Sequence, residues 1–150
     1  GGGVGGGMRL TAALPGGPGS AGCPAHILMA SEMASDAISE AGSMVGSGAV
    51  IVTDETRCMV KCLLRLSYFY YEESCGQCTP CREGTGWLYR MVDRIEHGQG
   101  KSSDLELLND VSDNIQCRTI CALGDAAAMP VPAFIKHYPD EFQHPIARKP

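Results

Sequence analysis

Three cysteines lie close together in the middle of the chain, at a spacing that suits metal binding. Cys75, Cys78 and Cys81 follow one another with two residues between each pair. Such a run presents three thiolates from one loop, and a cubane iron–sulfur cluster takes these ligands plus a fourth cysteine from elsewhere in the sequence. The cysteines downstream of the run are Cys117 and Cys121. The spacing therefore predicts a [4Fe–4S] cluster whose fourth ligand is one of these two.

Zinc is the main alternative metal, because four thiolates also satisfy a tetrahedral Zn²⁺ ion. Structural zinc sites usually draw two ligands from each of two Cys-x2-Cys knuckles, whereas three of the ligands here come from one loop. The pattern favours iron and sulfide. The spacing alone does not choose between Cys117 and Cys121, although Cys121 lies just before 122–125, where N–H groups at a helix start can stabilise a negative cluster.

Other residues of metal-binding type have no partner at a suitable spacing. Cys58 and Cys62 are four residues apart on a predicted helix, but no second pair matches them, so we interpret them as buried core thiols. We assign no site to the histidines. These are His26, His97, His137 and His144.

Helical periodicity predicts a bundle on either side of the cysteine run. Apolar residues recur at helical spacing from 59 to 71, and Asp54 is the predicted N-cap of this first helix. We interpret its aromatic residues, at 68–71, as packing side chains. A second apolar stripe begins at Trp87 and ends before Gly98, a residue type suited to the position after a helix.

Two further segments continue the helical pattern. Ser103 and Glu106 have the capping-box spacing, and the apolar residues after them predict a third helix that leads back toward the cluster. Asp125 is the predicted cap of a last helix, in which prolines are tolerated only near the first turn. From Pro139 onward the chain is predicted to be a surface tail. In the predicted domain organisation, this tail is the separate region 141–150.

The first third of the chain differs from this helical part. It holds most of the 19 glycines, and clusters of glycine and proline at 1–7 and 15–19 break regular elements into short pieces. A nucleotide loop is disfavoured, because no apolar strand precedes Gly1. Residues 49–52 are predicted to form a short buried strand. The predicted fold class is α+β.

Composition excludes some functions. The net charge is −5 and the basic residues form no stripe, so nucleic acid is not an expected partner. No apolar run approaches the roughly 18 residues of a membrane helix, so we predict no direct membrane insertion. No secretory signal begins the sequence, and its eight cysteines are expected in a reducing compartment.

The sequence around the cysteines resembles a known family. The block Glu73–Trp87, together with Thr119–Asp125, closely resembles the C-terminal part of the NADH-binding flavoprotein subunit of respiratory complex I. The likeness extends over nearly the whole chain, from the glycines at 2–3 onward. One departure is Cys117, which stands where the family usually has glycine.

This resemblance implies a ligand set and a role. The implied [4Fe–4S] ligands are Cys75, Cys78, Cys81 and Cys121. The family binds FMN and NADH in a domain that precedes everything in this sequence, so the chain alone is not expected to oxidise NADH. As part of NADH:ubiquinone oxidoreductase, its cluster would take single electrons from FMN and pass them toward ubiquinone. Arg82 would either help to tune the potential or be an ordinary capping cation.

The resemblance also implies an organisation. Residues 1–54 would be the C-terminal part of a soluble-ligand-binding β-grasp domain, 55–140 an antiparallel helical bundle that holds the cluster, and 141–150 the tail. The implied partners are the small flavoprotein subunit and the large iron–sulfur subunit. In a split enzyme, a separate chain carrying the FMN domain would be a third partner. The length of chain between Cys81 and Cys121 suits mitochondrial members. The implied location is the matrix side of the mitochondrial inner membrane, with the cytoplasmic side of a bacterial plasma membrane as the alternative.

Two other functions stay open from the sequence. The same cysteine block is similar in the diaphorase subunits of NAD-linked hydrogenases and formate dehydrogenases, although no extra ferredoxin-like cysteine motif is present here. The chain could also be a structural subunit of the complex, as a divergent, split or remnant copy. The four intact cysteines favour a retained cluster and electron transfer.

Overall fold

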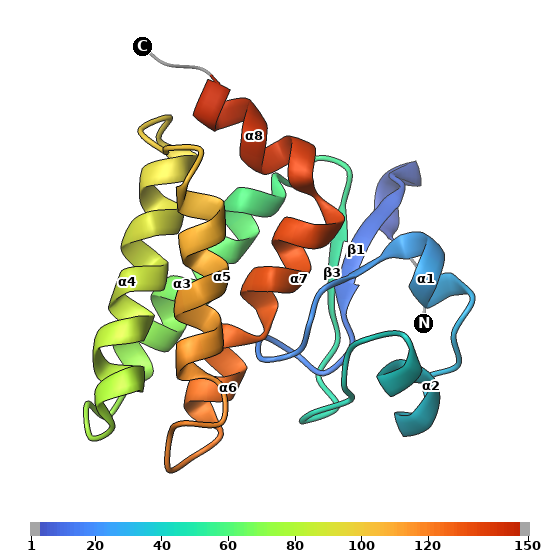
Figure 1. The fold of residues 1–150 in the computed structure, drawn as a ribbon. Helices are drawn as coiled ribbons and strands as arrows, with labels where there is room; N and C mark the ends of the chain where they lie inside the picture. The colour runs from blue at the N-terminus through green and yellow to red at the C-terminus, as the bar shows by residue number, and fades with distance from the viewer. Residues whose placement is uncertain (1–3, 148–150) are drawn as a thin grey trace.

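A small antiparallel sheet lies beside a bundle of helices (Figure 1). The structure is a computed structural model and describes residues 4–147. In chain order the elements are η1 (Gly5–Gly7), β1 (Leu10–Leu14), β2 (Cys23–Pro24), α1 (Ala25–Met29), α2 (Ser35–Glu40), β3 (Ile51–Asp54), α3 (Met59–Glu73), α4 (Thr79–Glu96), α5 (Asp104–Ile115), α6 (Leu123–Ala128), α7 (Pro130–His137) and α8 (Pro139–Ala147). The mixed helix and sheet content agrees with the predicted α+β class.

The sheet has the strand order β2-β1-β3, with both pairs antiparallel. Thr53 on β3 is buried, and its hydroxyl donates to the carbonyl of Ala12 on β1 at 3.0 Å. The predicted strand at 49–52 is therefore present, displaced to Ile51–Asp54. The prediction that it is buried is wrong, because β3 is an edge strand and Val52 is largely exposed.

The helices α3, α4 and α5 lie side by side, and α7 packs against α3 and α5 (Figure 1). Their buried apolar side chains form one core, which also takes in Leu14 from the sheet. A Cβ atom on Gly84 of α4 would lie 2.6 Å from Cδ1 of Ile115 on α5. A glycine is therefore needed at this position for the two helices to approach so closely.

The end of α4 confirms its prediction. Gly98 has φ +72°, a left-handed conformation that glycine adopts at little cost. The N–H of Gly98 donates to the carbonyl of Ile95 at 3.0 Å, and the N–H of Gln99 donates to that of Arg94 at 2.9 Å. This pair of bonds is a Schellman motif, which satisfies the last carbonyls of the helix.

The predicted N-cap at Asp54 is wrong, whereas Ser103 does occupy the N-cap position of α5, as predicted, but without a side-chain capping bond. Asp54 belongs to β3, where its carboxylate accepts from the N–H of Thr56 at 2.9 Å, and α3 begins only at Met59. Carboxylates near both helix starts bond to turns instead, because Asp and Asn bond readily to backbone groups two or three residues away. Sequence spacing alone does not show whether such a side chain caps a helix or bonds to a turn.

The predicted surface tail is also wrong for the part of it that the structure describes. Residues 139–147 form helix α8, whose Phe142 is fully buried in the core. Glu141 accepts from the N–H of Met59 at 2.7 Å, which ties α8 to the start of α3. One buried aromatic residue is too weak a signal for periodicity to reveal. Residues 148–150 of the predicted tail and residues 1–3 lie outside the described part.

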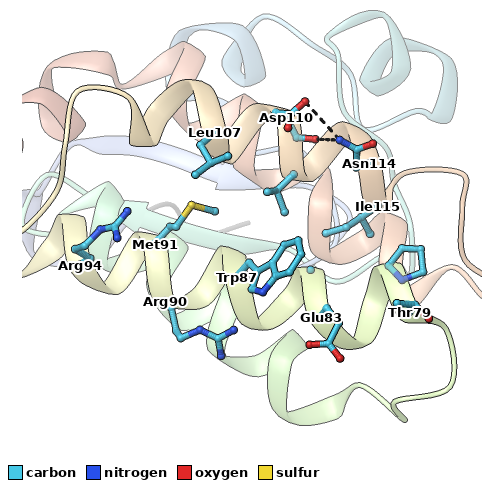
Figure 2. A pocket seen from close by; sticks show the side chains of 13 residues that line it. Thr79, Glu83, Trp87, Arg90, Met91, Arg94, Leu107, Asp110, Asn114 and Ile115 are labelled. Carbon is cyan, nitrogen blue, oxygen red and sulfur yellow. Dashed lines mark hydrogen bonds between the residues drawn. The ribbon is translucent and has the colours of Figure 1, made fainter.

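Several predicted core side chains lie at the surface. Of the aromatic residues at 68–71, Tyr70 is buried and the other three are exposed. Trp87 is exposed as well, because its side chain lies along the open space between α4 and α5 and not in the core (Figure 2). Cys58 is exposed and Cys62 is partly buried, so the prediction of two buried core thiols is wrong for Cys58. Although the Cys58 residue is exposed, neighbouring atoms exclude some water from its thiol as they do from that of Cys62, and this desolvation raises the pKa of both thiols.

Candidate metal centre

The cysteine run spans the turn from α3 into α4. Cys75 lies in the loop and is exposed, Cys78 is the N-cap of α4, and Cys81 is buried in the first turn of that helix. Gly76 has φ +75°, and its carbonyl accepts from Nη1 of Arg82 at 3.0 Å. The loop is thus closed onto the start of α4, with the sulfur-bearing residues on one short segment.

The start of α4 suits negatively charged ligands. Its first-turn N–H groups have no partner within the helix, and the helix dipole places partial positive charge at this end. The hydroxyl of Ser74 lies 3.3 Å from Sγ of Cys81. A negatively charged group held by this segment would therefore lie at the positive end of α4, with the Ser74 hydroxyl beside the sulfur of Cys81.

A second loop, between α5 and α6, lies against the first. The N–H of Ile120 donates to Sγ of Cys78 at 3.4 Å, across 42 residues of sequence. The hydroxyl of Thr119 donates to the carbonyl of Cys121 at 2.9 Å, and a Cβ atom on Gly124 would lie 2.5 Å from that hydroxyl oxygen. The tertiary structure therefore brings the Cys121 loop to the cysteine run.

Cys117 has a different setting. Its φ of +57° is the only positive value at a non-glycine residue in the described part of the chain. Its N–H donates to Oδ1 of Asp125 at 2.6 Å, so this carboxylate fixes the end of α5. Asp125 lies inside α6, and the prediction that it caps the helix containing Pro130 and Pro132 is wrong. Cys117 is exposed, like Cys121.

The donor set fits an iron–sulfur cluster. All eight cysteines are free thiols, so none of the predicted ligands is consumed in a disulfide. Within residues 4–147, no three His, Cys, Asp or Glu side chains are close enough to share one metal ion. A cubane bonds each thiolate to a different iron, so its ligands surround a cage and do not meet at one point. Three thiols on one loop and a fourth on the facing loop match that requirement.

Two residues that touch sulfur were not predicted from the sequence. Ser74 precedes the cysteine run, and a Ser-Cys pair carries no special signal. Ile120 contributes only its backbone N–H, a group that nearly every residue type has, so no sequence pattern could reveal it. Arg82, in contrast, was singled out, and the structure shows it bonded to the Gly76 carbonyl and to Glu83.

A membrane-spanning segment is not found in the described part of the chain. None of the helices within residues 4–147 combines the length and the apolar character needed to cross a bilayer.

A family profile and the similar proteins of known sequence all point to the same family. A family profile described as "NADH-ubiquinone oxidoreductase-F iron-sulfur binding region" matches residues 61–145. The F-type subunit of NADH-quinone oxidoreductase from Rickettsia bellii (strain OSU 85-389) is 44% identical over 146 residues, which are 97% of this chain and 35% of that protein. The corresponding NADH-quinone oxidoreductase subunit from Rhodobacter capsulatus is 43% identical over 151 residues, covering 99% of this chain and 35% of that protein. The chain thus spans about a third of the length of these relatives.

A solved structure has the same fold. An NAD⁺-reducing [NiFe]-hydrogenase in the H₂-reduced state superposes with a TM-score of 0.83 at 26% identity, over 95% of this chain and 24% of that chain. The family match is the more specific finding, since it includes all four predicted ligands and carries the cluster type in its designation, NADH_4Fe-4S. The predicted family is confirmed: this chain belongs to the NADH-ubiquinone oxidoreductase-F iron–sulfur binding region family.

Proposed function

We propose that this chain is the electron-transfer portion of an NADH-quinone oxidoreductase flavoprotein subunit. Its proposed cluster ligands are Cys75, Cys78, Cys81 and Cys121. The hydrogen bond from the Ile120 N–H to Sγ of Cys78 supports this set most directly, because it holds the Cys121 loop against the cysteine run. When bound, a [4Fe–4S] cluster supplies one-electron transfer.

The residues around the proposed ligands would influence the reduction potential of the cluster. Hydrogen bonds to cysteine sulfur and the positive end of a helix dipole both favour added negative charge, and so raise a reduction potential. The N–H of Ile120 and the start of α4 act in this way on Cys78. Ser74 is placed to act on Cys81. The chain thereby sets the ease with which an electron is accepted.

The relatives support a proposal for the function of the complete protein. They are named as subunits of NADH-quinone oxidoreductase, and this chain spans about a third of them. We infer that FMN and NADH bind in a part of such a subunit outside the third that this sequence spans, and that electrons pass from FMN through this chain toward a quinone. The chain alone is then not expected to oxidise NADH.

The finer organisation is part of the same proposal. We assign the sheet region, up to residue 54, to the end of a β-grasp domain and 55–140 to the cluster-binding bundle. The proposed partners are the small flavoprotein subunit and the large iron–sulfur subunit, and, in a split enzyme, a chain with the FMN domain. We propose a peripheral position at a respiratory membrane. The relatives compared above are bacterial, and the mitochondrial location stays a prediction.

A second candidate function is the diaphorase part of an NAD-linked hydrogenase. The similarity to the NAD⁺-reducing hydrogenase supports it, since the two folds superpose over 95% of this chain. The identity is only 26% there, against 44% for the Rickettsia bellii relative. We therefore favour the quinone oxidoreductase.

The test is anaerobic reconstitution with iron and sulfide, followed by metal analysis and electron paramagnetic resonance of the dithionite-reduced protein. We expect about four irons per chain and a [4Fe–4S] signal. The signal should be lost or altered in Cys121→Ser and kept in the matched variant Cys117→Ser. Bound zinc, or no metal in a folded chain, would refute electron transfer and leave the structural-subunit hypothesis.

A further inference from the structure

The proposed ligand Cys121 has little packing of its own. Its side chain is exposed, whereas that of Cys81 is buried. The neighbouring Ile120 provides no anchor either, because its side chain is 80% exposed. The Cys121 thiol can therefore keep a fixed position only if other contacts hold the backbone of its loop.

Thr119 is the residue of this loop that turns inward. Residues 117, 118, 120, 121 and 122 are exposed, whereas Thr119 is half-buried. Its side chain lies against Gly124 in α6, where a Cβ atom would be 2.5 Å from Oγ1 of Thr119 and 2.6 Å from its Cγ2. No side chain larger than hydrogen fits at position 124 unless Thr119 moves. Gly124 therefore provides the space that Thr119 occupies.

This inward position gives the Thr119 hydroxyl a specific partner. It donates to the carbonyl oxygen of Cys121 at 2.9 Å. The bond spans the peptide units on either side of Ile120, whose own N–H donates to Sγ of Cys78 at 3.4 Å. Figure 1 shows the loop between α5 and α6 at the same end of the bundle as the turn from α3 into α4. One hydroxyl therefore restrains two groups at this end, the Cys121 residue and the Ile120 N–H.

We propose that Thr119 is the positioning residue for the fourth cluster ligand. Its hydroxyl holds Cys121 and the Ile120 N–H in the arrangement that the cluster requires, and Gly124 provides the space for it. The inference rests on the proposed function, in which Cys121 is a ligand. Thr119 is not itself a ligand and acts only through Cys121 and Ile120.

This role predicts effects that a purely structural residue would not have. Without the hydroxyl, the Ile120 N–H is no longer held toward Cys78, and the loss of a hydrogen bond to cluster sulfur lowers the reduction potential. Cys121 is also held less firmly. Substitution of a group that orients a metal ligand typically weakens metal binding about 10–100-fold.

The experiment uses the full chain, reconstituted anaerobically with iron and sulfide. Every protein compared carries Cys117→Ser, so that a second cysteine of the same loop cannot replace Cys121. We expect Thr119→Val to lower the reduction potential, measured by titration followed with electron paramagnetic resonance. It should also speed the removal of iron by a ferrous chelator about tenfold or more. Thr119→Ser keeps the hydroxyl and should restore both values.

Gly124→Ala tests the same arrangement from the side of α6. Alanine has a higher helix propensity than glycine, so this substitution would stabilise α6 if the space beside it were free. We expect it instead to displace Thr119 and to reproduce the effects of Thr119→Val. The matched control is Thr53→Val, which removes a buried hydroxyl that donates to the Ala12 carbonyl at 3.0 Å in the sheet. It should leave the potential and the rate of iron removal unchanged.

Urea unfolding of the iron-free proteins separates positioning from stability. A folded Thr119→Val chain that binds no iron, with binding restored in Thr119→Ser, would also support the inference. Unchanged values in Thr119→Val or Gly124→Ala, or equal changes in Thr53→Val, would overturn it. If Thr119→Val does not fold, Gly124→Ala decides. A normal cluster in the Cys117→Ser parent leaves the proposed function standing in each of these cases, whereas an iron-free parent would refute that function and this inference with it.

Discussion

Cys117 stores local backbone strain beside the proposed cluster. A residue with a Cβ atom costs roughly 1–2 kcal/mol in the left-handed region, and Cys117 has φ +57°. Glycine adopts this conformation at little cost, which gives a physical reason for the glycine that the family resemblance implies at this position. The strain is sustained by the bond from the Cys117 N–H to Asp125.

We predict that Cys117→Gly raises the free energy of unfolding by about 0.5–1 kcal/mol, since relief of the strain exceeds the entropic cost of glycine. Urea unfolding of the two proteins measures it. Cys117→Ala keeps the Cβ atom and removes the thiol, so it should show little gain. An equal gain in both variants would mean that the thiol, and not the backbone, is the source of the strain.

Asp104 is a buried carboxylate at the start of α5. It accepts from Nη2 of Arg94 at 2.6 Å and from the N–H of Lys101 at 2.8 Å, and its side chain is almost wholly buried. We predict that Asp104→Ala lowers the free energy of unfolding by about 2–4 kcal/mol, because both donors lose their partner. A double-mutant cycle with Arg94→Ala measures the coupling. Additive effects of the two substitutions would contradict a direct pairing.

Among the secondary-structure elements, α8 is anchored by one aromatic side chain. Phe142 is fully buried among residues of the bundle core, although the sequence around it has the composition of a polar tail. We predict that Phe142→Ala lowers the free energy of unfolding by about 3–5 kcal/mol. Its exposed neighbour provides the control, because Gln143→Ala should change stability by less than about 0.5 kcal/mol. Thermal and chemical unfolding measure both changes. If Phe142→Ala lowers the free energy of unfolding only slightly, α8 is a weakly attached surface segment, as the sequence predicted.

Over the molecule as a whole, the proposed cluster links two loops that are distant in sequence. The cysteine run and the Cys121 loop touch through one weak N–H···S bond in the described structure. A group bound only by the folded state stabilises that state by mass action. We predict that reconstitution raises the melting temperature of the chain and that chelation of iron lowers it again, as scanning calorimetry would show. The melting temperature of Cys121→Ser should rise much less on reconstitution. An equal rise in that variant would exclude Cys121 as a ligand.

Alkaline pH should weaken the packing of the C-terminal helices against the sheet. Burial, together with the nearby Cys23, Glu141 and Cys62, raises the pKa of Tyr138 to about 12 from an ordinary value of 10. Below pH 10 the phenol is neutral in both states, whereas between pH 10 and 12 the unfolded chain loses its proton first. We predict that the free energy of unfolding falls over this range.

The variant Tyr138→Phe isolates this contribution. It removes the ionisable group, so its stability should fall less steeply between pH 10 and 12 than that of the unchanged protein. The comparison concerns slopes, because the variant also loses the bond from the Tyr138 hydroxyl to the Thr11 carbonyl at 3.4 Å. Parallel slopes would show that other groups, such as the partly buried thiols, account for the loss.

Features that depend on local chemistry could be predicted from the amino-acid sequence alone. The Cys-x2-Cys-x2-Cys run specified the kind of cluster, because ligand type and spacing belong to one short segment. Gly98 ended α4 as predicted, because a left-handed backbone position favours glycine wherever it occurs. The family was likewise identified from contiguous motifs, and the comparison confirmed it.

Features that depend on distant residues emerged only from the folded chain. Ile120 reaches Cys78 because α5 and α6 return the chain to the cysteine run, and that contact uses a backbone group with no sequence signature. Phe142 is buried and Trp87 is exposed because of the elements that pack beside each of them. The hydrophobicity of a residue does not by itself predict which elements these are. Local patterns describe which interactions a residue can make, and tertiary packing selects the neighbour with which it makes them.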